Sequence, residues 1–226
     1  MSRESSTLTA FISASGWGSR LAPSDLDRVL ASVRLLRVKS GQHLTRAGDT
    51  AEHWFGILDG TVIQTVNGFD GRAANLTAAC SGTWFGEGTL LKRAHWGYDA
   101  VSRKEGTFAL VPAETFHWLV EMSLPFNQFV ARLLNSRLSH YMGTLANERL
   151  TNTDQRMAHM LAGLFDPELY PNRAASLRIT QSDIALLAGM SRQRANATLQ
   201  KLQDEALIQI NRTGLTILQV DKLREY

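Results

Sequence analysis

The stretch from residue 180 to residue 218 constrains the fold most, because two short helical patterns and a strand hairpin follow one another there. Thr180 to Asp183 resembles a capping box, with a hydroxyl at the N-cap and a carboxylate three residues on. Gly189 suits a tight turn, and Ser191 is the next N-cap. Apolar residues of the second helix then recur at helical spacing. This order predicts two short helices that meet at a turn.

The second predicted helix carries side chains that suit the major groove of DNA. Its N-terminal end presents Arg192, Gln193, Arg194 and Asn196. Arginine pairs bidentately with guanine, and asparagine or glutamine with adenine. In a helix-turn-helix, the first residues of the second helix meet the base edges. We therefore predict that these four residues bind DNA.

The two short helices are followed by a predicted hairpin, in which residues 207–210 and 215–218 alternate around 211–214. In this position a hairpin makes a wing, so we predict a winged helix-turn-helix. We expect Thr180, Ser191 and Arg212 to contact backbone phosphates. The alternative is a small helical bundle with a solvated polar face. Charge does not exclude this alternative, since residues 180–214 hold four Lys/Arg and three Asp/Glu.

The first half of the chain reads as short strands separated by turns. Turn residues that include Gly, Asp, Asn and Pro divide apolar runs at 35–39, 43–46, 54–58, 61–66 and 109–111. Short apolar runs that are separated by turn residues are typical of an antiparallel barrel or sandwich.

From Ser123 to Asn152 the spacing becomes helical, and Ser123 is the expected N-cap. A helix of this length exceeds the usual globular range. Its apolar seam predicts a homodimer, although a single core helix inside a monomer is the alternative. The seam residues recur at spacings of four, three and four: Leu134, Leu138, Tyr141 and Leu145.

Composition and motifs limit the function classes. The single cysteine, Cys80, excludes an internal disulfide and an iron–sulfur cluster held by four thiolates of one chain. We expect a cytoplasmic protein without a membrane partner, because we see neither a signal peptide nor an apolar run of about 18 residues. The six histidines lack metal-ligand spacing, and no catalytic motif stands out. We therefore predict no metal site and no enzyme.

With these motifs in place, the chain resembles the catabolite activator/fumarate–nitrate regulator (Crp/Fnr) family. The likeness is carried by TQSDIALLAGMSRQRANATLQKLQDEALIQI from Thr180, by GDTAEHWFGILDGTV from Gly48 and by GTWFGEGTLL from Gly82. The resemblance implies an α+β fold with three parts. These are an effector-sensing, cyclic-nucleotide-binding-like β-roll (jelly roll) at 1–122, a dimerisation helix at 123–152 and a winged helix-turn-helix DNA-binding domain at 153–226.

The resemblance also points to an effector pocket. Family members that bind cyclic AMP hold its phosphate with an arginine and a serine that follow a glycine–glutamate turn, here Gly86-Glu87. The aligned positions here are Tyr98 and Asp99, and a carboxylate repels phosphate in a poorly solvated pocket. We therefore predict a pocket of Gly86, Glu87, Tyr98, Asp99 and His95 that does not use cyclic AMP. Some relatives bind haem, for which His95 is the residue to test.

The expected partners are a palindromic double-stranded DNA operator, a second copy of the chain, RNA polymerase and an unidentified small-molecule effector. Family members often have an arginine where this chain has Ala197, so the operator sequence stays open. The alternative function is a ligand-sensing or protein-interaction module with a vestigial DNA-binding domain. Salt-dependent binding to a palindromic duplex would separate the two functions, because only the first neutralises many phosphates.

Overall fold

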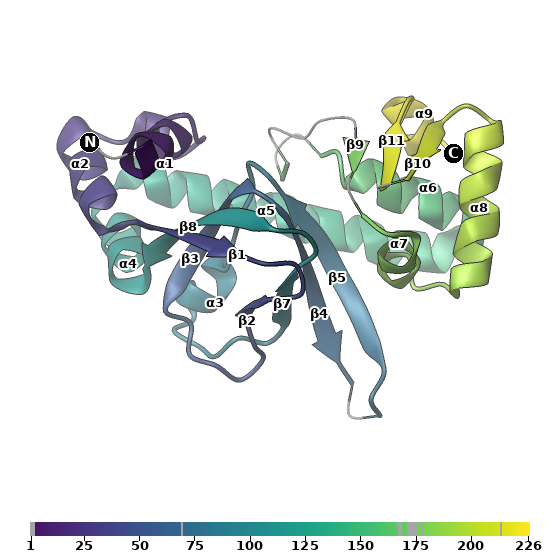
Figure 1. Ribbon diagram of the computed structural model, residues 1–226, viewed down its shortest axis with the longest axis horizontal. Helices are drawn as coiled ribbons and strands as arrows, with labels where there is room; N and C mark the ends of the chain where they lie inside the picture. Colours follow the sequence, from purple (N-terminus) through teal and green to yellow (C-terminus); the bar gives the residue numbers. More distant parts are fainter. Residues whose placement is uncertain (1–2, 69, 167–168, 171–175, 178, 213) are drawn as a thin grey trace.

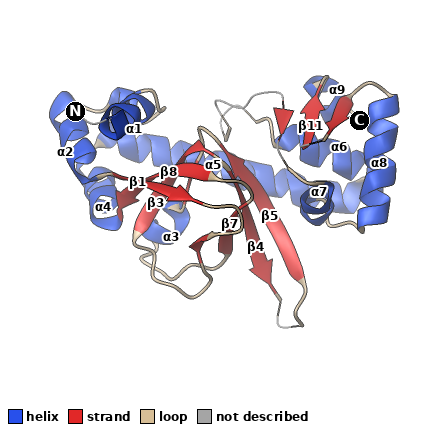
Figure 2. Ribbon diagram, viewed as in Figure 1, coloured by secondary structure: helices blue, strands red, loops and turns tan. Residues whose placement is uncertain are grey.

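A long helix, α5 (Leu124–Leu150), organises the molecule, and strands and shorter helices pack along it (Figure 1). The computed structural model describes residues 3–68, 70–166, 169–170, 176–177, 179–212 and 214–226. Helices α1 (Arg3–Ser13) and α2 (Pro23–Ser32) lie at the end of the molecule opposite the C-terminal helices. The strands of the first half lie between these two ends (Figure 2).

The first half forms a β-roll of two four-stranded antiparallel sheets, in the orders β1-β8-β3-β6 and β2-β7-β4-β5. The predicted strands are confirmed with small shifts of their ends. The strand β5 had no sequence signal, because its alanine-rich run has low strand propensity and forms through pairing with β4. The strands are β1 (Arg34–Val38), β2 (His43–Thr45), β3 (His53–Asp59), β4 (Thr61–Asn67), β5 (Ala73–Cys80), β6 (Trp84–Phe85), β7 (Asp99–Ser102) and β8 (Gly106–Pro112).

An aromatic cluster joins the N-terminal helices, the β-roll and α5. Trp54 and Trp84 stack with ring centroids 4.3 Å apart. Trp17, just before the short helix η1 (Gly18–Arg20), packs edge-to-face with Trp84 at 5.1 Å. Phe126 of α5 packs against the same rings. Large aromatic side chains bury much apolar area, so this cluster fixes α5 against the roll.

The helix α5 follows α4 (Ala113–Met122) directly. Ser123 occupies the N-cap position as predicted, but its side chain makes no capping hydrogen bond. Pro125 stands in the first turn, so one backbone donor that a cap could satisfy is absent. The predicted single long helix is otherwise confirmed.

The C-terminal part contains the predicted helix-turn-helix and wing, with Thr213 outside the described residues. Its apolar core, which includes Met157, Leu161 and Leu199, also takes in Ile63 and Ala78 of the β-roll. The two halves therefore share one packed region. Its elements are α6 (Thr153–Gly163), β9 (Ser176–Leu177), α7 (Gln181–Leu187), α8 (Arg192–Asp204), β10 (Ile208–Asn211), β11 (Gly214–Ile217) and α9 (Val220–Arg224).

Candidate DNA interface and effector pocket

The turn between α7 and α8 is built by local signals. The Thr180 hydroxyl accepts a hydrogen bond from the Asp183 backbone N–H at 3.1 Å, which caps α7. Gly189 adopts φ +63°, a left-handed conformation that favours glycine. The Ser191 hydroxyl accepts from the Arg194 backbone N–H at 3.3 Å and caps α8. These contacts place the N-terminal end of α8 at the surface.

The helix α8 buries one face and presents the other. Ala195, Leu199 and Leu202 lie in the C-terminal core. Arg192 and Gln193 are exposed, as predicted for residues that would reach bases. Asn196 is only half-buried, and its buried side-chain Oδ1 has no hydrogen-bond partner among the residues that the structure describes. Asn196 therefore lies at the margin of the exposed face.

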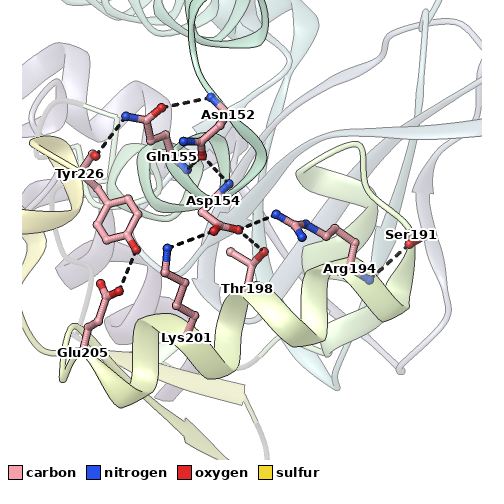
Figure 3. Close-up of polar contacts among 9 residues, drawn as sticks. All are labelled: Asn152, Asp154, Gln155, Ser191, Arg194, Thr198, Lys201, Glu205 and Tyr226. Carbon is pink, nitrogen blue, oxygen red and sulfur yellow. Dashed lines mark hydrogen bonds and ion pairs between the residues drawn. The ribbon is translucent and has the colours of Figure 1, made fainter.

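A cluster around Asp154, at the start of α6, holds one flank of α8 (Figure 3). The Asp154 carboxylate accepts from Arg194 at 3.0 Å, from the Thr198 hydroxyl at 2.8 Å and from Lys201 at 3.1 Å. The Thr198 hydrogen bond is the largest cause that lowers the pKa of Asp154. Arg194, expected on the outward face, is exposed there and also reaches toward α6. The local sequence pattern did not predict this contact, because the acid that attracts Arg194 lies on a different helix.

A hollow of about 400 Å³ lies between the start of α7, the start of α8 and the wing. Arg192 and Arg212 both line it, together with Thr180, Gln181 and Ser182. Two cationic side chains and a helix N-terminus thus face one concave surface, which is the arrangement that binds phosphate. The structure brings together three of the predicted DNA-binding residues here: Thr180, Arg192 and Arg212.

Asp183 of α7 connects the C-terminal part to the β-roll. Its buried carboxylate lies 2.8 Å from a guanidinium nitrogen of Arg103, which follows β7. The Thr180 hydroxyl also donates to this carboxylate at 2.8 Å. A second link joins Thr77 of β5 to Tyr170, whose hydroxyl oxygens are 2.8 Å apart. The position of α7 is therefore coupled to the roll by polar contacts.

The predicted effector pocket centres on the Gly86-Glu87 turn, and α3 (Glu87–Leu91) follows it. Gly86 has φ +106°, and a Cβ there would lie 2.6 Å from the Trp96 ring. The Glu87 side chain is almost fully buried, and its Oε1 lies 2.6 Å from Nε of Arg137 on α5. Trp54 Nε1 donates to the other carboxylate oxygen at 3.4 Å. Both oxygens that could grip a ligand hydroxyl are thus engaged by the protein.

Arg137 is the central residue that the sequence reasoning missed. It also donates to the backbone carbonyl of Trp84 at 2.6 Å. Burial by itself lowers the pKa of Arg137, but the Glu87 carboxylate and nearby tyrosine hydroxyls outweigh burial and raise the pKa. The signal was present in the sequence, because Arg137 falls four residues after buried Leu133 on the apolar stripe of α5. A charge on such a stripe requires a partner.

Of the remaining predicted pocket residues, Tyr98 lies within the electrostatic reach of Glu87. Burial raises the pKa of Tyr98 well above its usual range, and the Glu87 carboxylate adds to the rise. Asp99 accepts from the Ala47 backbone N–H at 2.9 Å and from the Asn67 side chain at 3.0 Å. His95 is exposed. The Glu87 and Asp99 carboxylates are thus both engaged by groups of the protein, Glu87 by Arg137 and Asp99 by Ala47 and Asn67.

The seam predicted on α5 is largely uncovered in this single chain. Leu138 is 58% exposed and Leu145 50% exposed, and Tyr141 is also exposed. Leu134 differs, since it is half-buried against the aromatic cluster. Exposed apolar residues that recur on one face of a helix form a surface that favours association with another protein surface.

Two further observations concern the described part of the chain. No helix there is long and apolar enough to cross a membrane. Within the same residues, no group of three or more His, Cys, Asp or Glu side chains could hold a metal ion.

Comparison with known proteins matches both halves of the chain to families. A model of the cyclic nucleotide-binding domain matches residues 35–123, which cover the β-roll strands and α4. A model of the Crp-like helix-turn-helix domain matches residues 155–226.

Individual relatives resemble the chain over most of its length. The cAMP-activated global transcriptional regulator CRP of Pasteurella multocida (strain Pm70) is 25% identical over 197 residues, which cover 85% of this chain and 93% of that protein. The solved structure of FixK2 from Bradyrhizobium japonicum has a TM-score of 0.71 at 14% identity and covers 85% of this chain and 96% of its own. The solved structure of the c-di-GMP responsive global regulator CLP of Xanthomonas campestris has a TM-score of 0.64 at 22% identity. The match covers 87% of this chain and 99% of that chain. The fold of these structures is that of the present chain.

Proposed function

Because this chain belongs to the Crp/Fnr family of transcription regulators, we propose that it is a homodimer that reads a palindromic operator through α8 and does not use cyclic AMP. The proposal has three parts: base reading by α8, dimerisation through α5, and a sensor pocket closed to cyclic phosphate. RNA polymerase is the expected further partner, and the cytoplasm is the expected location, where the DNA target lies.

The observation that carries base reading is the exposed N-terminal end of α8, where Arg192 and Gln193 are both accessible. We assign Arg192 and Gln193 to base edges in the major groove, with Asn196 beside them. We assign Arg212 and the N-terminal turn of α7, from Thr180, to phosphates. Ser191 caps α8 next to this surface. Arg194 joins the interface only if its contact with Asp154 opens, so we give it a positioning role.

Dimerisation is supported by the uncovered seam of α5. Leu138, Tyr141 and Leu145 are exposed at heptad-like spacing, and a second copy of the same helix presents a matching surface. A two-fold dimer places two recognition helices about 34 Å apart, one helical turn of DNA. A palindromic operator with half-sites at that separation follows from this geometry.

Independence from cyclic AMP is supported by the Glu87–Arg137 ion pair. Arg137 already binds the Glu87 carboxylate that a sugar hydroxyl would need. By the family resemblance, Asp99 aligns with the serine that holds the phosphate in relatives that bind cyclic AMP. We propose that the roll either binds an effector of different chemistry or stays DNA-competent without one. A ligand shifts the protein only through different affinities for its conformations.

The base-reading test compares Arg192→Ala with Arg46→Gln, an exposed arginine far from the C-terminal part in sequence. Arg192→Ala should weaken binding to the operator by about 1–3 kcal/mol and relax specificity at one symmetric base pair. Fluorescence anisotropy with specific and scrambled duplexes at several salt concentrations measures both effects. If Arg192→Ala weakened both duplexes equally, the base-reading role would be wrong. An absence of salt-dependent duplex binding by the unmodified protein would instead favour the alternative, an interaction module with a vestigial DNA-binding domain.

A further inference from the structure

A second cavity, distinct from the Gly86-Glu87 region, lies where α1, the β-roll and α5 meet. Its volume is about 550 Å³, within the range of about 300–1,000 Å³ that small-molecule sites occupy. Phe11 and Ala14 line it from α1 and the turn that follows, Trp84 from the roll, and Phe129 and Leu133 from α5. None of these residues belongs to the DNA interface or to the Glu87–Arg137 pair.

The cavity combines apolar walls with positive charge. Phe11 and Trp84 stack at 5.4 Å, and Phe129 and Leu133 add apolar surface from α5. Arg20 and Arg132 also line the cavity, and both are exposed. Within the described residues, neither of these two guanidinium groups forms an ion pair with a carboxylate. An occupant with an apolar body and one anionic group would match both features.

Trp84 supplies a further observation. Its side chain is 5% exposed, and its indole N–H has no hydrogen-bond acceptor among the described residues. Because this N–H is itself buried within the protein, Trp84 contributes its aromatic ring to the cavity wall and not its hydrogen-bond donor.

The cavity stays accessible when α5 dimerises. At about 100° per residue, Phe129 and Ser136 lie almost opposite Leu138 on the helix. The dimer seam and the cavity therefore use different faces of α5. Leu169, which follows α6, is also part of the cavity wall, so an occupant touches the sensor half and the C-terminal half together.

We propose that this cavity binds an amphipathic monoanion, a medium-chain carboxylate with its chain against Phe11 and Leu133 and its head between Arg20 and Arg132. The site is separate from the cyclic-nucleotide position and does not rest on DNA binding. Its occupancy would tie α1 to α5 and to Leu169.

The test measures ligand binding to the full chain by calorimetry, without DNA. The first ligand is decanoate below its critical micelle concentration, and the second is decanol, which has the same chain length but no charge. Decanoate should bind more tightly than decanol. The double variant Arg20→Gln/Arg132→Gln should weaken decanoate about tenfold, as expected for two exposed ion pairs, and leave decanol unchanged. Arg46→Gln is the matched control and should bind decanoate like the unmodified protein.

A space-filling variant tests the location independently. Ala14 is exposed at the cavity, so Ala14→Phe should fill it without disturbing the core, and binding of both probes should be lost. The proposal is overturned if decanoate does not bind, if decanol binds equally well, or if Ala14→Phe binds decanoate unchanged. Because no DNA is present, these outcomes do not depend on the proposed function.

Discussion

Replacing Arg137 by methionine tests the buried ion pair between Glu87 and Arg137. Arg137→Met keeps a long apolar stem but removes the partner of Glu87 at 2.6 Å and the donor to the Trp84 carbonyl. The Glu87 side chain is 4% exposed, so its charge stays buried without a counterion.

The burial of Glu87 sets the expected loss of unfolding free energy in Arg137→Met. Breaking a buried pair on one side costs about 3–5 kcal/mol. Because the Arg137 side chain is itself 23% exposed, we expect the lower end, about 3 kcal/mol. That loss is a large part of a typical total of about 5–15 kcal/mol. In a chain of this size it lowers Tm by about 6–12 °C.

The assay is urea unfolding followed by far-ultraviolet circular dichroism, with a double-mutant cycle. Arg149→Met, an exposed arginine on the same helix, is the control and should change stability by less than about 0.5 kcal/mol. In the double variant Glu87→Gln/Arg137→Met, the loss of unfolding free energy should be smaller by at least about 1 kcal/mol than the sum of the losses in the two single variants. The stabilising role of the Glu87–Arg137 pair would be contradicted if Arg137→Met lost less than about 1 kcal/mol of unfolding free energy. It would also be contradicted if the effects of the two single variants were strictly additive.

Three further predictions concern association, ligand and pH. Leu138→Asp/Leu145→Asp should give monomers in sedimentation, because charges would enter the seam, and a double variant that remained dimeric would defeat this interface. Cyclic AMP at micromolar concentration should give no heat of binding in calorimetry, and binding that also tightened operator affinity would reject the prediction. Burial lowers the pKa of His140, so the stability it contributes is complete above the unfolded-state pKa of about 6.5 and declines as pH falls below it. Unfolding at pH 7 and pH 5 should show this decline, and His140→Asn should reduce it; an equal decline in the variant would assign the effect elsewhere.

The helix-turn-helix was predictable because its signals are local. The caps at Thr180 and Ser191 and the left-handed turn at Gly189 each act within a few residues, and the structure confirms all three. The strand β5 (Ala73–Cys80) was not predicted, because its conformation depends on pairing with β4. The helix α1 also had no assigned signal.

The candidate sites were predictable only in part, because charged side chains form ion pairs with residues that are distant in sequence. Glu87 was identified, but its partner Arg137 comes from another element. Arg194 was predicted to face outward with Gln193 and is exposed, but its contact with Asp154 of α6 was not predicted. Local pattern shows which residues are available, while tertiary contacts decide where they point.

Base reading by α8 is measured by selection of duplexes from a random pool with the 226-residue chain, followed by sequencing. We expect an enriched two-fold palindrome whose half-sites lie about one helical turn apart. We also expect that Arg192→Ala loses preference at one symmetric position of that palindrome. Recovery of no enriched sequence, or of one that Arg192→Ala selects equally well, would contradict the claim that α8 reads DNA.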